Sequence, residues 1–431
     1  MRAEANIQSN EVLISLKLNL LDRCRKLLRR KFNKSHIENL DFFFRYSFKI
    51  DEDRIDPDLI TLAILLSVYP YLGFPWLSVN LPVSKRFKRL TRRHLGVLLL
   101  TTPRSETKRK NTKQKLTCID ATPINRDHLR PGLAFSMGSD SLAARILMPT
   151  NTYSLFIDRP TLERSLYKKE NLYDGIQGFL ENVGEVDTVF SNFENLRRPI
   201  GFAIIDSQPD LNLAALAPLI IVAKIKMLDS LSLGTVSESL YGFGGVNYSD
   251  PRDSRYFQGF ADFLADVGLP LFLPLGGLSE VNSMRISLSN PAVTAWSCIR
   301  GENGMPCMNC YKCFRKESLK ADLLSKSWSS DQVNTILSTP EVSRKISGGH
   351  IHHGNVLAWQ VQNFPKAAYW KLTDSIRPYQ AQLTFIEKWF AKSIEYVPEK
   401  YRHGFKQSLK KFTILTMTNE ESKEAMNWKG K

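Results

Sequence analysis

The stretch Gly132-Leu133-Ala134-Phe135-Ser136-Met137-Gly138-Ser139-Asp140-Ser141-Leu142-Ala143 decides the fold, because its character changes twice within a few residues. An apolar run enters it, small polar residues fill its middle, and apolar residues at helical spacing leave it. This pattern predicts a strand, a tight turn and the first turn of a helix. The first turn of a helix carries unpaired backbone N–H groups and the positive end of the helix dipole. The turn is therefore a candidate anion site.

The polar side chains of residues 136–141, called the serine turn below, suit a phosphate ligand. Ser136, Ser139 and Ser141 offer hydroxyl donors. Asp140 offers a carboxylate for a magnesium ion that would neutralise phosphate charge. Taken alone, the same residues fit an ordinary serine-rich helix N-cap equally well.

Strand-like and helical segments alternate after this turn. Residues 153–158, 187–190 and 231–235 are candidate strands, and the nearly continuous apolar run 211–228 is typical of a helix that covers a sheet. The alternation predicts an α/β fold with a parallel, doubly wound sheet and helices on both faces. Ligands of such sheets bind at the carboxyl ends of the strands.

The length and charge of the chain indicate additional parts around this core. A chain of 431 residues is expected to form roughly two or three domains. We expect a basic N-terminal domain of unknown function over residues 1–130, the core over 131–325, and a mainly helical region over 326–431. Residues 1–130 hold 26 Lys and Arg against 13 Asp and Glu, although the whole chain carries a net charge of +16. This asymmetry suits a polyanionic partner such as a nucleic acid, and a solvated basic surface explains it equally well.

Two apolar patterns lie within the N-terminal part. Residues 11–34 are basic with leucines at helical spacing, so we expect a helix there. Residues 59–84 are uncharged and long enough to span a bilayer, but prolines divide them, which favours a buried helix followed by extended chain. Most of the six cysteines crowd into residues 298–313, as in a reduced chain. We therefore expect a soluble cytoplasmic protein without membrane contact.

The most specific motif is the cysteine cluster. Cys298, Cys307, Cys310 and Cys313 are spaced by nine, three and three residues. Four thiolates at this spacing can converge on one tetrahedral Zn²⁺, which would then fold the loop and perform no chemistry. An iron–sulfur cluster also takes four cysteines and is the less favoured alternative. A second cluster, Gly348-Gly349-His350-Ile351-His352-His353-Gly354, has no acidic or cysteine partner nearby in sequence, and a polar loop is favoured over a metal site.

These motifs together resemble a known family. The serine turn resembles the Ser-Gly-Gly-x-Asp-Ser loop of PP-loop ATP pyrophosphatases (adenine nucleotide α-hydrolase-like fold), with Met137 in place of the first glycine. The Trp-Ser-Cys start at residues 296–298 and the Cys-x-x-Cys-x-x-Cys-x-Arg finish at residues 307–315 resemble the zinc knuckle of the 7-cyano-7-deazaguanine synthase (QueC) family. The resemblance covers about residues 132–320.

A third motif lies between the first two. The chain reads Asn-Tyr-Ser-Asp-Pro-Arg-Asp-Ser-Arg at residues 247–255, where the family has Asp-Tyr-Ser-Gly-Tyr-Pro-Asp-Cys-Arg. Tyr248, Asp253 and Arg255 keep their places in this motif. An Arg-Asn pair of the family survives only as Asn212, and a lysine and a glutamate of the family are replaced by Glu280 and Asn282.

The resemblance implies an ATP-dependent C–N ligase. In the family, ATP activates a 7-carboxy-7-deazaguanine carboxylate as an acyl adenylate and releases pyrophosphate. Ammonia then forms an amide, and a second ATP drives dehydration to a nitrile. By match to the motifs, residues 136–141 would bind ATP and Mg²⁺, with Ser136, Asp140 and Ser141 catalytic. Tyr248, Asp253, Arg255 and Asn212 would bind the substrate, with Asp253 and Arg255 also catalytic, and the four cysteines would bind Zn²⁺.

The segments outside residues 132–320 indicate which product of the activated carboxylate to expect. Long, diverged chains of this kind resemble the QueC-like proteins of anti-phage defence systems, in which the acceptor of the activated carboxylate is thought to be a partner protein. We therefore expect amide formation with a protein acceptor. Three alternatives stay open: a plain synthase of the queuosine precursor that uses ammonia, a tRNA-modifying PP-loop enzyme, and a non-catalytic nucleotide-binding module in which Met137 has disabled the phosphate site.

Overall fold

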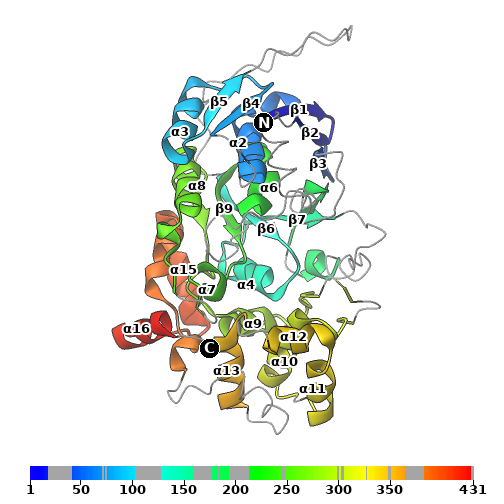
Figure 1. Ribbon diagram of the computed structural model, residues 1–431, viewed down its shortest axis with the longest axis vertical. Helices are drawn as coiled ribbons and strands as arrows, with labels where there is room; N and C mark the ends of the chain where they lie inside the picture. Colours follow the sequence, from blue (N-terminus) through cyan, green and yellow to red (C-terminus); the bar gives the residue numbers. More distant parts are fainter. Residues whose placement is uncertain are drawn as a thin grey trace.

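The structure is a computed structural model (Figure 1). It describes residues 1–17, 41–69, 72, 75–101, 128–159, 177–182, 184–193, 213–243, 248–298, 300–301, 305–326, 328–347, 351–364 and 383–428.

One ten-stranded sheet runs through the molecule, in the order β10-β9-β6-β7-β8-β3-β2-β1-β4-β5. Its strands are β1 (Arg2–Gln8), β2 (Glu11–Lys17), β3 (Phe42–Tyr46), β4 (Trp76–Val79), β5 (Leu98–Thr101), β6 (Arg130–Phe135), β7 (Tyr153–Asp158), β8 (Val186–Ser191), β9 (Leu228–Leu233) and β10 (Leu271–Phe272).

The half of the sheet from β6 to β10 is entirely parallel and doubly wound. Strands β7 and β8 extend from β6 on one side, and β9 and β10 extend from it on the other. The chain therefore changes direction across the sheet between β6 and β9, and such a switch point is where doubly wound sheets bind ligands. The predicted strands at 153–158, 187–190 and 231–235 correspond to β7, β8 and β9.

The N-terminal strands continue the same sheet. Strand β3 pairs antiparallel with β8, and β2 and β1 follow in antiparallel order, while β4 and β5 pair in parallel with β1 and with each other. The predicted helix over residues 11–34 is wrong for residues 11–17, which form β2, and residues 18–34 lie outside the described residues. Val12, Ile14 and Leu16 are buried there and alternate with less buried residues. This period of two is that of a half-buried strand.

Helices cover both faces of the sheet. Leu133 and Phe135 of β6 share a core with α4 (Ser139–Leu147) and α15 (Glu399–Lys411). Ala134, between them, belongs to the core on the other face, with α2 (Pro57–Val68), α6 (Ala217–Ile221) and α8 (Arg255–Asp266). Helix α8 packs in turn on α3 (Lys85–Leu95). This alternation is why residues 132–135 are apolar throughout.

Of two apolar segments that were predicted to be helical, one forms the predicted helix and the other does not. Residues 57–68 form the buried helix α2, and β4 follows, as predicted. The single helix predicted over 211–228 is wrong for residues 213–228: η5 (Leu213–Leu216) is followed by α6, which has Pro218 in its first turn, and turns lead into β9. Proline lacks the N–H that would continue the preceding turn. Among the described helices, none has the length and apolarity needed to cross a membrane.

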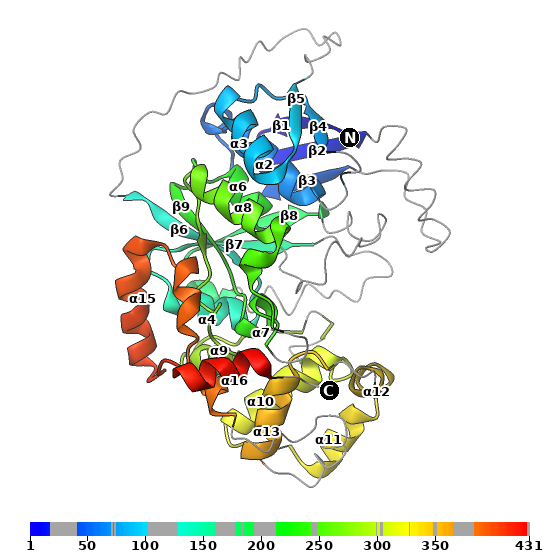
Figure 2. The same cartoon turned by 60° about the vertical axis from the view of Figure 1, so that its left-hand side comes forward.

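The described part of the chain after β10 is mainly helical and gathers at the end of the molecule opposite β1–β5 (Figure 2). Its remaining elements are α9 (Glu280–Leu288), α10 (Tyr311–Leu323), α11 (Ser330–Leu337), α12 (Pro340–Ser347), α13 (Gly354–Asn363), η8 (Thr384–Glu387), η9 (Ala391–Tyr396) and α16 (Asn419–Asn427), together with α15. Helix α9 packs directly on α4. The C-terminal helices therefore lie against the end of the sheet that carries the serine turn.

Candidate functional site

The serine turn joins the end of β6 to the first residue of α4. The Ser141 hydroxyl donates to the Gly138 carbonyl oxygen over 3.0 Å and accepts from the Ser136 N–H over 3.2 Å. The Ser136 hydroxyl also donates to Ser141 Oγ, over 3.1 Å. Ser136 and Ser141 therefore stabilise the turn by hydrogen bonds within it. The prediction of strand, turn and helix for residues 132–143 is confirmed.

Met137 adopts a left-handed backbone conformation, with φ of 59°. A side chain in this region costs about 1 kcal/mol relative to glycine. The cost is offset because the Met137 side chain is fully buried among apolar residues of the sheet and α4. Its carbonyl oxygen accepts a hydrogen bond from the Trp296 N–H over 2.7 Å. The methionine thus fixes the turn in a conformation that glycine would adopt freely.

Gly234 brings the end of β9 against the same turn. A Cβ at Gly234 would lie 2.6 Å from the Ser141 backbone nitrogen and 2.7 Å from the Asp140 carbonyl carbon. Both atoms belong to the backbone and cannot move aside as a flexible side chain could. The carboxyl ends of β6 and β9 therefore meet at the serine turn, at the switch point of the sheet.

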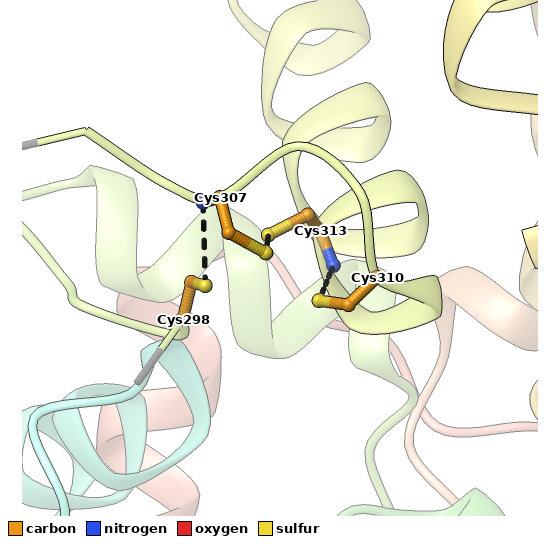
Figure 3. A group of neighbouring side chains, drawn as sticks. All are labelled: Cys298, Cys307, Cys310 and Cys313. Atoms are coloured by element: carbon orange, nitrogen blue, oxygen red, sulfur yellow. Dashed lines mark hydrogen bonds between the residues drawn. The ribbon is translucent and has the colours of Figure 1, made fainter. Parts of the chain in front are cut away.

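The four cysteines converge as predicted (Figure 3). Their Sγ atoms all lie within 4.8 Å of one another, and those of Cys307 and Cys313 are 3.6 Å apart. Tetrahedral zinc with Zn–S bonds of about 2.3 Å places its sulfurs ~3.8 Å apart, so the donor set fits this ion. Hydrogen bonds among the thiols lower the pKa of Cys298 and raise those of Cys310 and Cys313. The site is closed, because four thiolates complete a tetrahedral shell.

Local structure positions these cysteines. Cys310 is the N-cap of α10, and its Sγ accepts a hydrogen bond from the Cys313 N–H over 3.4 Å. Cys298 Sγ accepts from the Cys307 N–H over 3.5 Å. The loop between them requires Gly301, because a Cβ there would lie 2.0 Å from the Met305 carbonyl oxygen.

The residues just before Cys298 contact the serine turn directly. Besides the bond between Trp296 and Met137, the Ser139 N–H donates to Ser297 Oγ over 3.3 Å. The two motifs that lie far apart in the sequence are therefore neighbours in the structure.

A buried lysine of α10 also reaches the serine turn. Lys316 Nζ lies 2.8 Å and 3.0 Å from the two carboxylate oxygens of Asp140 and 3.0 Å from Ser139 Oγ. The Lys316 side chain is 2% exposed. Ser283 of α9 donates to Asp140 as well, over 2.6 Å. Both oxygens of Asp140 thus accept hydrogen bonds from the protein, and the side chain remains 28% exposed.

Glu280 lies at the centre of a buried charge cluster. Its carboxylate is 2.6 Å from Lys316 Nζ, 2.9 Å from Arg315 Nε and 2.7 Å from His353 Nδ1. Burial would raise the pKa of Glu280, but the charges of Arg315 and Lys316 and a hydrogen bond from His353 outweigh it and hold the pKa well below its usual range. Burial and then the charge of Arg315 lower the pKa of His353 to about 4. At neutral pH Glu280 is therefore ionised and His353 is neutral.

Glu238 is the third acid of this region. It accepts from the Glu280 N–H over 3.2 Å and from Asn355 Nδ2 over 3.0 Å. Burial and the charge of Glu280 raise the pKa of Glu238 to about 8, so it is protonated at neutral pH. The two lysine and arginine charges of the cluster are then matched by Asp140 and Glu280.

The other predicted site residues lie elsewhere. Tyr248 stacks on Phe243, with ring centroids 5.8 Å apart, and its hydroxyl accepts from Lys392 Nζ over 3.3 Å. Asp253 is exposed in η6 (Pro251–Asp253), and Arg255 is exposed at the start of α8, with its guanidinium beside Gly96. Within the described residues no hydrogen bond or ion pair joins Tyr248, Asp253 or Arg255 to the serine turn. Asn212 lies outside the described residues.

Sequence reasoning missed Lys316 as a neighbour of the serine turn, and Arg315 and His353 as neighbours of Glu280. The described part of the histidine cluster, residues 351–353, forms a turn before α13, in which His352 is exposed and His353 Nδ1 lies 2.7 Å from Glu280; His350 lies outside the described residues. The available signals were weak: Lys316 follows Cys313 by one helical turn, and Glu280 departs from the pattern of the resembled family. No local pattern says that these charges meet.

Comparison with known proteins gives one match. A model of a family described as a family of unknown function (DUF6395) matches residues 259–429. The match includes the four cysteines, Glu280 and Lys316 but not the serine turn. No curated protein and no solved structure matches the chain significantly.

Proposed function

We propose that the chain is a PP-loop-type ATP-dependent C–N ligase that forms AMP and pyrophosphate while activating the carboxylate of a 7-carboxy-7-deazaguanine-type substrate. The observation that carries this proposal is the position of the serine turn. It lies at the switch point of a doubly wound sheet and at the start of α4, where backbone N–H groups favour a phosphate, and it contacts the four-cysteine loop.

The chemistry explains why such a site would use ATP. A carboxylate is a poor electrophile because its leaving group would be oxide, whereas an acyl adenylate loses AMP. The protein would hold the carboxylate in line with the α-phosphate and offset the developing charge. Asp140, which also bonds to Lys316 and Ser283, would share the Mg²⁺ that accompanies ATP with the phosphates and water.

The acceptor of the activated carboxylate is proposed to be a partner protein in an anti-phage defence system, on the strength of the resemblance described above. The basic helix α3 is a candidate contact for an acidic face of that partner, because most of its Lys and Arg side chains are exposed.

The test is incubation of the purified protein with ATP, Mg²⁺ and 7-carboxy-7-deazaguanine, with AMP, pyrophosphate and modified products followed by mass spectrometry. We expect AMP and pyrophosphate. S141A removes the hydroxyl that closes the turn and should slow AMP formation by about tenfold or more. S67A, which removes a buried hydroxyl that donates to Ala63 O within α2, is the matched control and should leave the rate unchanged.

The other outcomes of this experiment distinguish the three alternative functions. A nitrile formed with ammonia alone identifies a plain synthase, and a product that requires tRNA identifies a tRNA-modifying enzyme. ATP binding without AMP formation identifies a non-catalytic module, which the engagement of Asp140 by Lys316 would favour. Absence of both binding and AMP overturns the proposal.

A further inference from the structure

We propose that metal occupancy of the four-cysteine centre sets the conformation of the serine turn, and that Ser297 and Lys316 are the positioning residues that transmit it. The inference rests on the proposed function in one respect, namely that the ligand held by the turn is a nucleotide phosphate. The coupling itself depends only on contacts between the cysteine loop, α10 and the turn.

Two sets of contacts, called arms below, join the cysteine loop to the serine turn. The first arm is made by the two residues that precede Cys298. Trp296 donates its N–H to the Met137 carbonyl oxygen, and Ser297 Oγ accepts the Ser139 N–H. Ser297 is the immediate neighbour of a predicted metal ligand and is itself buried. Any shift of Cys298 therefore changes the contacts that hold the left-handed Met137 and the first residue of α4.

The second arm follows Cys313. Cys310 caps α10, Cys313 lies in its first turn, and Lys316 lies one turn further along. Its ammonium reaches both Ser139 Oγ and Asp140. Because Lys316 is buried, its position is set by α10 and not by solvent, and the ion pair with Glu280 fixes it from the other side.

The two arms meet on one residue. Ser139 is bonded through its N–H to Ser297 and through its hydroxyl to Lys316. A metal bound by all four sulfurs joins Cys298 rigidly to residues 307–313, and so fixes the two arms relative to each other. Without it, the links described between the Cys298 loop and the start of α10 are weak thiol contacts, the Cys307 N–H bond and the bonds of Glu341 to Arg300 and to the Tyr311 N–H, none of which fixes Cys298 as a metal would. Ser139, which both arms contact, would then no longer be held in one position by the two of them together.

The experiment compares zinc-loaded protein with protein stripped by a chelator, with zinc content measured in both. Hydrogen exchange of peptides that cover residues 136–142 is the direct readout. We expect exchange to accelerate by about tenfold or more on zinc removal, while peptides of α2 and β4 remain unchanged. The affinity for a fluorescent ATP analogue should fall in parallel. Unchanged exchange at residues 136–142 after complete zinc loss overturns the coupling.

Variants separate positioning from general stability. S297A and K316M should each accelerate exchange at residues 136–142 while zinc stays bound, and K316R should restore the slow rate because guanidinium also pairs with carboxylates. S318A, which removes a buried hydroxyl from the same helix, is the matched control. Because K316M leaves Glu280 and Asp140 without their ammonium partner, S297A provides the test that does not unbalance buried charge. Native exchange in zinc-loaded S297A would contradict the proposal.

The two proposals fail in different ways. If zinc removal loosens the turn but zinc-loaded protein binds neither the ATP analogue nor pyrophosphate, the coupling stands and the proposed function falls. If the analogue binds equally well with and without zinc and exchange does not change, the coupling falls and the nucleotide site stands.

Discussion

At the scale of the residue, the protonation state of Glu238 determines the charge balance beside the serine turn. Glu238 and Glu280 are both buried, and Glu238 accepts the Glu280 N–H. Two buried carboxylates this close do not both stay ionised. The lysine and arginine partners favour the charge on Glu280, so Glu238 holds the proton.

E238Q tests this assignment. The pKa of Glu238 is about 8 in the folded protein against an ordinary value of 4.5, so folding takes up a proton between these pH values. The free energy of unfolding of the wild type therefore falls as pH rises from about 4.5 to about 8, by at most about 1.4 kcal/mol per pH unit. Glutamine cannot titrate, so E238Q should lose this decline and gain stability relative to wild type between pH 5.5 and pH 8.5.

Urea unfolding at several pH values measures the difference. The titration of His353, whose pKa is lowered to about 4, removes stability as pH falls below about 6.5, but it occurs in both proteins and cancels in the comparison. Parallel pH profiles for wild type and E238Q would show that Glu238 is not the group that holds the proton.

Single residues also mark the limit of inference from sequence. The serines and cysteines could be found because their chemistry is local: hydroxyls follow a strand, and thiols recur at a ligand spacing. The left-handed conformation of Met137 could not be predicted, because it depends on burial of its side chain in the folded core. The pairing of Lys316 with Glu280 beside the serine turn could not be predicted, since it depends on the packing of α10 on α9.

At the scale of the element, periodicity predicted β6, β7, β8, β9 and α2, in which the pattern is continuous. It failed for residues 11–17, because leucines spaced for a helix overlap a strand pattern, and for residues 211–228, because Pro218 divides the run. Pairing of β3 with β8 involves residues more than 140 positions apart, as in the register of Phe44 with Ser191, and no local pattern encodes it.

The contact between β9 and α4 gives a prediction at this scale. G234A places a Cβ 2.6 Å from the Ser141 backbone nitrogen, so the start of α4 must move away from β9. We expect a loss of about 2–4 kcal/mol in the free energy of unfolding, the range of severe packing defects, and weaker binding of the ATP analogue. Urea unfolding and fluorescence titration measure the two effects.

G404A is the matched control for this substitution. Gly404 lies within α15, and a Cβ there meets no atom within 4 Å. Because alanine is the better helix former, G404A should raise stability by about 0.5–1 kcal/mol. If G234A were as well tolerated as G404A, the serine turn would not be packed against β9 as described.

At the scale of the whole molecule, the continuity of the sheet predicts that the N-terminal strands and the doubly wound half unfold together. The junction is the pairing of β3 with β8, and Phe44 lies in it, fully buried, with its ring 5.7 Å from that of Phe193. F44A should lower the free energy of unfolding by about 3–5 kcal/mol. F43A, on the less buried side of the same strand, should cost clearly less.

Hydrogen exchange near the denaturation midpoint distinguishes one cooperative unit from two. Because the hydrogen-bond ladder crosses the junction without a break, peptides of β4 and of β7 should lose protection together in F44A, as they do in a single transition. Loss of protection at β4 with protection retained at β7 would mean that the N-terminal strands fold as a separate domain. In that case the basic N-terminal part could move relative to the serine turn, and its use in recognising an acceptor would not require the rigid sheet seen here.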